Sequence, residues 1–129
     1  MGETIAQTLT NKPTPYRPGH WFNSAKFFDI EYQTYGSILP VASENEKHFY
    51  WQHETENLAM RFAYHPKNNL FLGINTFGIR LRHQQLNDWL DQKVSVDFVI
   101  AKLSEANFDP EFYTKYEHKI QHSWLNTLK

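Results

Sequence analysis

Two histidines four positions apart are the first residues in this sequence that could do chemistry. On a helix, His118 and His122 would share one face, where two imidazoles can reach the same metal ion. Glu117 stands directly before His118, so the order differs from the His-Glu-x-x-His motif of zinc proteases. No third ligand is evident and cysteine is absent, so we predict no metal site here. The other histidines tested for ligation are scattered and are assigned to surface or sheet packing: His48, His53, His65 and His83.

Paired carboxylates are the second chemical possibility. Asp29 and Glu31 share one face of a predicted strand, and Glu44 and Glu46 lie in a polar turn. Glycoside hydrolysis needs two carboxylates that face each other across a cleft, and neither pair is placed to do so. We therefore interpret the first pair as a solvated strand face and the second as a solvated turn, and we assign no catalytic residue.

The glycines exclude the common nucleotide cradles. The 5 glycines occupy positions 2, 19, 36, 73 and 78, which cannot form GxGxxG or GxxxxGK[ST]. A GxSxG nucleophile elbow is also missing. We therefore expect that this chain is not a complete enzyme by itself.

The elements that must position these residues begin with strands. Alternation predicts a strand over 27–35, and further strands over 48–53, 58–64 and 70–76. Short polar turns join the later runs, which favours antiparallel neighbours. The residues expected on the half-buried face of the first strand are Phe28, Ile30, Tyr32 and Thr34.

From Ile79 the apolar spacing becomes helical. The first helix would bury Leu86, Trp89 and Leu90. Ser95 is a favourable N-cap for a second helix, whose apolar residues are Val96, Val99, Ile100 and Leu103. Asp109-Pro110-Glu111 predicts the start of a third, which continues through Phe112, Tyr116, Ile120 and Trp124. Strands followed by helices predict an α+β fold: an antiparallel sheet of about four to five strands with about three helices packed on one face.

Composition limits the partners. The chain has 129 residues, which fits one domain, and aromatic residues make up 16% of it. Its net charge is −1 without a basic block, so we expect no nucleic-acid partner. No stretch approaches the ~20 apolar residues of a spanning helix, so we expect no membrane insertion. The absence of cysteine favours a cytoplasmic location. Residues 1–18 are polar and proline-rich and are predicted to be a leader or linker, and residues 19–129 the folded domain.

One non-periodic segment combines glycine with two large rings. It reads Gly19-His20-Trp21-Phe22-Asn23-Ser24, and its rings suit either core packing or an interface. Together with residues 27–36, it resembles the opening of the C-terminal domain of FAD- and NAD(P)-dependent pyridine-nucleotide oxidoreductases, of the ferredoxin-reductase-like and apoptosis-inducing-factor-like kind. Residues 72–78 and 94–97 are similar to that domain's later strand, G-x-N turn and following helix start. The resemblance covers roughly residues 19–109.

The resemblance implies a role and a site. In that family the domain is an α+β unit that packs on the FAD- and NAD-binding domains of the same chain, and in some members it contributes to a homodimer. The opening segment approaches the flavin and nicotinamide rings, which assigns cofactor contact to Trp21, Phe22, Asn23 and Ser24. FAD and NAD(P)H would belong to the full-length protein, with none expected in this chain alone.

Other interpretations stay open. A stand-alone protein–protein interaction module with an aromatic-rich sheet face is the alternative, and a small-ligand enzyme using a histidine and an acid in a sheet–helix cleft is a third. The helices can cover only one sheet face, which would leave Ala59, Arg61 and Ala63 on the other. We therefore expect a symmetric dimer through the sheet face or a sheet edge; the competing outcome is a monomer whose exposed patch meets the flavin domain.

Overall fold

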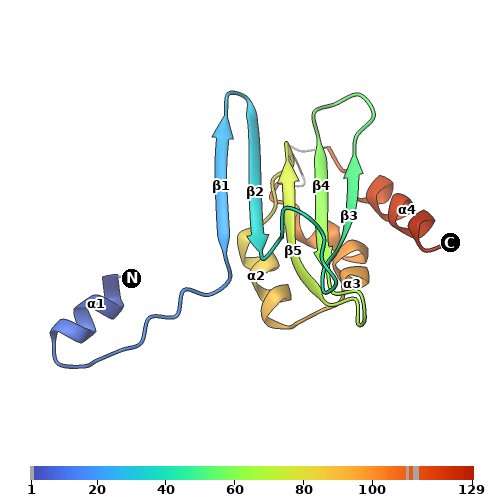
Figure 1. The fold of residues 1–129 in the computed structure, drawn as a ribbon. Coiled ribbons are helices and arrows are strands. Elements are labelled where there is room, and N and C mark those ends of the chain that lie inside the picture. The colour runs from blue at the N-terminus through green and yellow to red at the C-terminus, as the bar shows by residue number, and fades with distance from the viewer. Residues whose placement is uncertain (1, 110, 112–113) are drawn as a thin grey trace.

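The computed structural model describes residues 2–109, 111 and 114–129. Its centre is a five-stranded antiparallel sheet with the strand order β1-β2-β5-β4-β3 (Figure 1). The strands are β1 (Phe22–Phe27), β2 (Ile30–Gly36), β3 (Lys47–Gln52), β4 (Ala59–Tyr64) and β5 (Phe71–Phe77). The α+β fold expected from the sequence is thereby confirmed.

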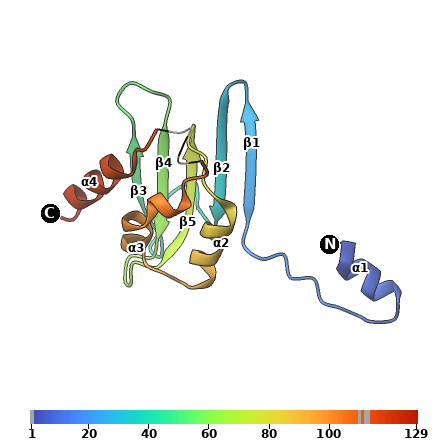
Figure 2. The same cartoon turned by 180° about the vertical axis from the view of Figure 1, so that it is seen from behind.

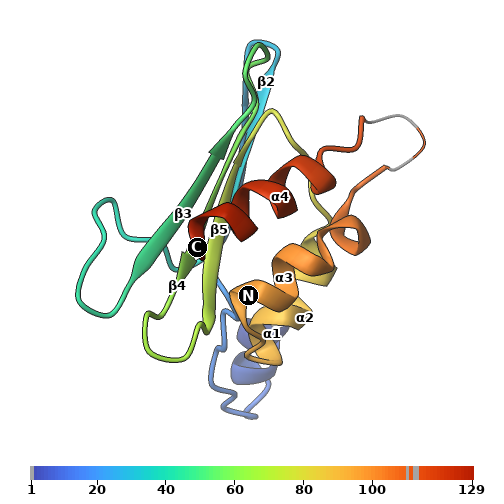
Figure 3. The ribbon, with the colours of Figure 1, turned by 90° about the vertical axis from the view of Figure 1, so that its right-hand side faces the viewer.

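The helices after the sheet lie on one of its faces (Figures 2 and 3). They are α2 (His83–Asp91), α3 (Val96–Ala101), the 3-10 turn η1 (Leu103–Ala106) and α4 (Glu117–Thr127). No helix in the described ranges is long and apolar enough to cross a membrane.

The predicted helical pattern accounts for the covered face. Leu86, Trp89 and Leu90 of α2 are buried, as are Val96, Val99 and Ile100 of α3. Ser95 caps α3, because its Oγ accepts a hydrogen bond from the Phe98 backbone N–H at 3.2 Å. These predictions are confirmed.

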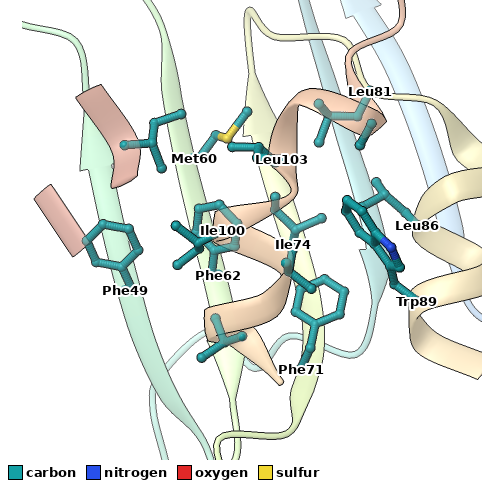
Figure 4. Packing of buried hydrophobic residues seen from close by; sticks show 14 of the residues in the cluster. Phe49, Met60, Phe62, Phe71, Ile74, Leu81, Leu86, Trp89, Ile100 and Leu103 are labelled. Carbon is teal, nitrogen blue, oxygen red and sulfur yellow. The ribbon is translucent and has the colours of Figure 1, made fainter. Parts of the chain in front are cut away.

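The core fills the space between the sheet and these helices (Figure 4). Phe62 and Ile74, on the adjacent strands β4 and β5, are completely buried. Phe49 packs edge-on against Trp124 of α4, with ring centroids 5.0 Å apart. Trp124 also donates from Nε1 to Asp97 Oδ1 at 2.9 Å, which ties α4 to α3.

The prediction for the first strand was wrong in two respects. The run 27–35 is divided by a turn at Phe28 and Asp29, and β1 precedes that turn, in a segment without apolar alternation. The buried face of β2 is also the opposite one, because Gln33 and Tyr35 are buried while Tyr32 is 38% exposed. Both buried side chains reach the backbone of Leu81, so their polar atoms are satisfied inside the protein.

The third predicted helix starts later than expected. Pro110 and Phe112 lie outside the described residues, residues 114–116 are not helical, and α4 begins at Glu117. Tyr116 instead donates its hydroxyl to Glu56 at 2.6 Å, which draws this segment toward the β3–β4 turn. Ile120 and Trp124 are buried as predicted.

The predicted leader contains a helix that the sequence patterns did not indicate. α1 (Gly2–Leu9) has no buried residue, and an extended segment separates it from the sheet (Figure 1). Its apolar residues Ile5 and Leu9 are 55% and 79% exposed. α1 therefore takes no part in the core of the domain.

The β2–β5 pair depends on two facing glycines. Gly36 pairs with Gly73, and Gly36 also has a φ of +74°. A Cβ on Gly73 would stand 2.5 Å from the Tyr35 carbonyl oxygen, and one on Gly36 would stand 2.3 Å from that of Leu72. Larger residues at either position would push β2 and β5 apart.

We expect Phe28→Gly to stabilise the domain. Phe28 has a φ of +55° at the first position of a two-residue hairpin turn, where glycine is the favoured residue. Removing the left-handed strain should raise the free energy of unfolding by about 1 kcal/mol, measured by urea denaturation. Lys93→Gly is a matched control that should also stabilise the domain, because Lys93 has a φ of +54° directly after α2, where glycine is favoured. A loss of stability in Phe28→Gly alone would mean that the ring contributes more to the fold than the strain costs.

Candidate functional site

The four residues assigned to cofactor contact lie at one edge of the sheet. Trp21 precedes β1 and is 67% exposed, and Phe22 opens the strand at 40% exposed. Asn23 and Ser24 follow and are exposed as well. The structure therefore places these residues together on an accessible surface, and this sequence assignment remains a prediction.

The backbone of this segment is held firmly although its rings are accessible. The Gly36 N–H donates to the Trp21 carbonyl at 2.8 Å, and His20 Nε2 lies 2.9 Å from Asp91 Oδ1 of α2. Beside them is a hollow of about 650 Å³, which Trp21 lines together with Leu90 and Lys93. An exposed indole on an anchored backbone is a preorganised contact residue, because little entropy is lost when it meets another surface.

Phe22 connects this edge to the core. Its ring lies 4.7 Å from that of Tyr35 and 4.4 Å from that of His83, at the start of α2. Tyr35 is 1% exposed and donates its hydroxyl to the Leu81 carbonyl at 3.2 Å. Burial, and then the nearby negative charge of Glu31, raise the pKa of Tyr35 to about 12, while Arg80 opposes the rise. Tyr35 therefore stays protonated and serves as a structural donor.

The sheet face opposite the helices forms a second candidate site. Register places Tyr32, Phe77, Ala59 and Gln52 side by side in one row, and Thr34, Asn75, Arg61 and Tyr50 in the next. A groove of about 620 Å³ lies over these two rows, which we call the open-face groove. Its volume is in the range of ~300–1,000 Å³ typical of ligand sites.

Hydrogen bonds between side chains fix the polar row. Asn75 Oδ1 accepts from Arg61 Nε at 3.1 Å and from Arg61 Nη2 at 2.8 Å. Asn75 Nδ2 in turn donates to Thr34 Oγ1 at 2.8 Å. Arg61 is thus held in place by a neutral amide, and among the described residues no carboxylate forms an ion pair with it.

Sequence reasoning found part of this groove. Alternation placed Ala59 and Arg61 on the face opposite Met60 and Phe62, and that placement is confirmed by the burial of the latter two. The partner Asn75 was missed, because nothing local indicates which residue of another strand will lie opposite Arg61.

Three histidines line one hollow, which the sequence did not indicate. His118 and His122 of α4 line a hollow of about 610 Å³, and His53 from the end of β3 lines it too. Lys119 Nζ lies 3.0 Å from His53 Nε2, and the Glu56 N–H donates to His53 Nδ1 at 3.2 Å. In the described part of the chain, no group of three or more His, Cys, Asp or Glu residues could hold a metal ion.

The carboxylates serve the structure. Glu46 is 5% exposed, so its assignment to a solvated turn was wrong: Oε1 accepts from the Leu39 N–H at 2.8 Å and lies 2.7 Å from His48 Nε2. Asp29 lies in the hairpin turn instead of on a strand face with Glu31, and Glu31 lies 3.5 Å from the Arg80 Nε.

No protein-family model matches the sequence, and a search of curated proteins finds no match either. Function must therefore be inferred from the residues of this chain.

We expect Trp21 and Phe22 to contribute little to the stability of this domain. Trp21→Ala should lower the free energy of unfolding by less than about 0.5 kcal/mol, since the indole is largely exposed. Phe22→Ala removes the stack on Tyr35 and should cost about 1 kcal/mol. Thermal and urea unfolding measure both effects. A loss above about 3 kcal/mol in the double variant would identify the pair as core residues.

The raised pKa of Tyr35 predicts an alkaline loss of stability. Since the pKa is about 12 in the folded state and 10.0 ordinarily, the unfolded chain releases this proton first as the pH rises. Stability should fall from about pH 10 toward pH 12 in the wild type. Tyr35→Phe should be about 1 kcal/mol less stable at neutral pH and should show a shallower alkaline decline. Urea unfolding across this range tests the idea, and parallel curves for the two proteins would contradict it.

Proposed function

We propose that this chain is the C-terminal interface domain of a cytoplasmic FAD- and NAD(P)-dependent oxidoreductase. Its role would be to pack against nucleotide-binding domains and to present the Trp21–Ser24 segment toward the bound flavin and nicotinamide. The observation that carries the proposal is an exposed side chain on an anchored backbone at Trp21. The residue is 67% exposed, and its carbonyl accepts a hydrogen bond from the Gly36 N–H.

Two further features support this assignment. Trp21 and Phe22 lie at the sheet edge, where the indole is 67% exposed and the Phe22 ring, although it stacks on Tyr35, is still 40% exposed. The helix α1 has no residue buried against this domain, although Ile5 and Leu9 give it an apolar side. An amphipathic helix of this kind gains stability by packing on another surface, and neighbouring nucleotide-binding domains would supply one.

The chemistry itself would belong to the cofactors. Hydride transfer between a nicotinamide and a flavin is carried out by the two ring systems, and the protein supplies binding and orientation. The glycine positions of this chain make no phosphate cradle, so FAD and NAD(P)H would bind to the partner domains. Trp21 and Phe22 would contribute flat apolar contact near the rings, and Asn23 and Ser24 would contribute hydrogen-bonding groups.

A second candidate is a stand-alone protein–protein interaction module. The open-face groove favours it, because aromatic residues border a fixed arginine there and the helices leave this face uncovered. Aromatic residues and arginine are the residues most enriched at binding hot spots.

The product of the complete gene distinguishes the two candidates. If the proposal is right, it should purify with bound flavin or take up added FAD, seen in the visible absorption of flavin, and should oxidise NADH or NADPH. Trp21→Ala in that protein should perturb the flavin spectrum or the rate of NAD(P)H oxidation, while the surface control Lys67→Ala should change neither. A product that never binds FAD would leave the interaction module as the better description.

A further inference from the structure

The tip of the β1–β2 hairpin exposes two aromatic rings beside a carboxylate. Phe27 is 70% and Phe28 84% exposed, and the two rings meet edge to face with centroids 4.7 Å apart. Asp29 follows directly and is exposed. Phe28 also has a φ of +55°, an unfavourable conformation for a bulky residue. Neither the strain nor the exposed rings stabilise a single copy of the domain, and both features are typical of contact sites.

The open-face groove offers the complementary chemistry. Along its first row, the small side chain of Ala59 lies between Phe77 and Gln52, which leaves a hollow walled by larger residues. Arg61 is the next residue of β4 on the same face, and Asn75 holds its guanidinium at two nitrogens. Because this amide is neutral, the positive charge of Arg61 is oriented without being neutralised, which suits it to a carboxylate from outside the sheet.

The groove and the hairpin tip of one copy cannot meet each other. The strands β2 and β5 separate β1 from β4, and β1 is paired with β2 along its whole length. Phe27 is paired with Ile30, which shares the face of Tyr32, so this ring and the groove belong to the same side of the sheet. A second copy that faces this side of the sheet supplies an identical hairpin tip.

We propose that two copies of this chain associate through their open faces, with Phe28 and Asp29 of each copy seated in the groove over Ala59 and Arg61 of the other. The ring of Phe28 fills the hollow over Ala59, and the Asp29 carboxylate accepts hydrogen bonds from the guanidinium of Arg61. The same contact occurs twice, as a two-fold axis requires. This interface goes beyond the proposed packing on nucleotide-binding domains and does not depend on it.

Exchange of the two charges tests the interface on the 129-residue chain. Sedimentation equilibrium should show a reversible dimer for the wild type. Asp29→Lys and Arg61→Glu should each weaken it at least about tenfold, because like charges then face each other at both contacts.

Recombining the two changes should restore the dimer. In an equimolar mixture of the single variants, a mixed dimer places the D29K tip in the R61E groove at one contact and the unchanged Asp29 against the unchanged Arg61 at the other. The double variant D29K/R61E likewise has opposite charges at both contacts. The mixture and the double variant should therefore each regain most of the wild-type affinity.

Two controls separate a specific contact from a folding defect. Glu105→Lys, in the helical layer, and Lys67→Glu make the same kinds of charge change at exposed positions outside both surfaces and should leave the dimer unchanged. Phe28→Gly removes the ring while relieving the backbone strain, so it should weaken association without lowering the melting temperature at concentrations where the wild type is monomeric. Circular dichroism and thermal melting establish that every variant is folded.

Three outcomes would overturn the interface. The first is a constant monomer mass for the wild type up to high micromolar concentration. The second is a dimer that is insensitive to Asp29→Lys, Arg61→Glu and Phe28→Gly. The third is a double variant and a mixture that both associate as weakly as the folded single variants. The flavin content of the complete gene product is measured separately, so failure of this interface and failure of the proposed oxidoreductase role are distinguishable.

Discussion

The backbone of Leu81 is held from both directions by side chains of β2, and much of the structure follows from this contact. The Leu81 N–H donates to Gln33 Oε1 at 2.8 Å, and its carbonyl accepts from the Tyr35 hydroxyl at 3.2 Å. Leu81 lies between β5 and α2, so these two hydrogen bonds attach the start of the helical layer to the sheet. They also satisfy polar groups that would otherwise be costly to bury.

This contact determines which side of β2 faces the core. Since side chains alternate along a strand, burying Gln33 and Tyr35 places Tyr32 and Thr34 on the face opposite the helices. There Thr34 meets Asn75, and Asn75 orients Arg61. The orientation of the Arg61 guanidinium in the open-face groove therefore depends on Gln33 and Tyr35, the polar residues on the core face of β2.

The two candidate surfaces have different physical characters. The Trp21–Ser24 segment is an anchored edge with exposed rings, suited to contact with a neighbouring domain. The open-face groove combines aromatic walls with a fixed positive charge, and the strained hairpin tip offers an aromatic ring with a negative charge. The two surfaces use opposite ends of β1, since Trp21 directly precedes this strand and the hairpin tip directly follows it.

Local patterns in the sequence were enough to predict the α+β class, the antiparallel strands β3 to β5 and the helices α2 and α3. Periodicity and capping are short-range properties, so Ser95, Trp89 and Phe62 could be placed without the fold. The inverted face of β2 could not, because apolar alternation favours Tyr32 whereas two long-range hydrogen bonds favour Gln33 and Tyr35. Only tertiary structure decided that Arg61 meets Asn75, that His53 joins His118 and that Glu46 is buried, since each depends on partners brought together by strand pairing or helix packing.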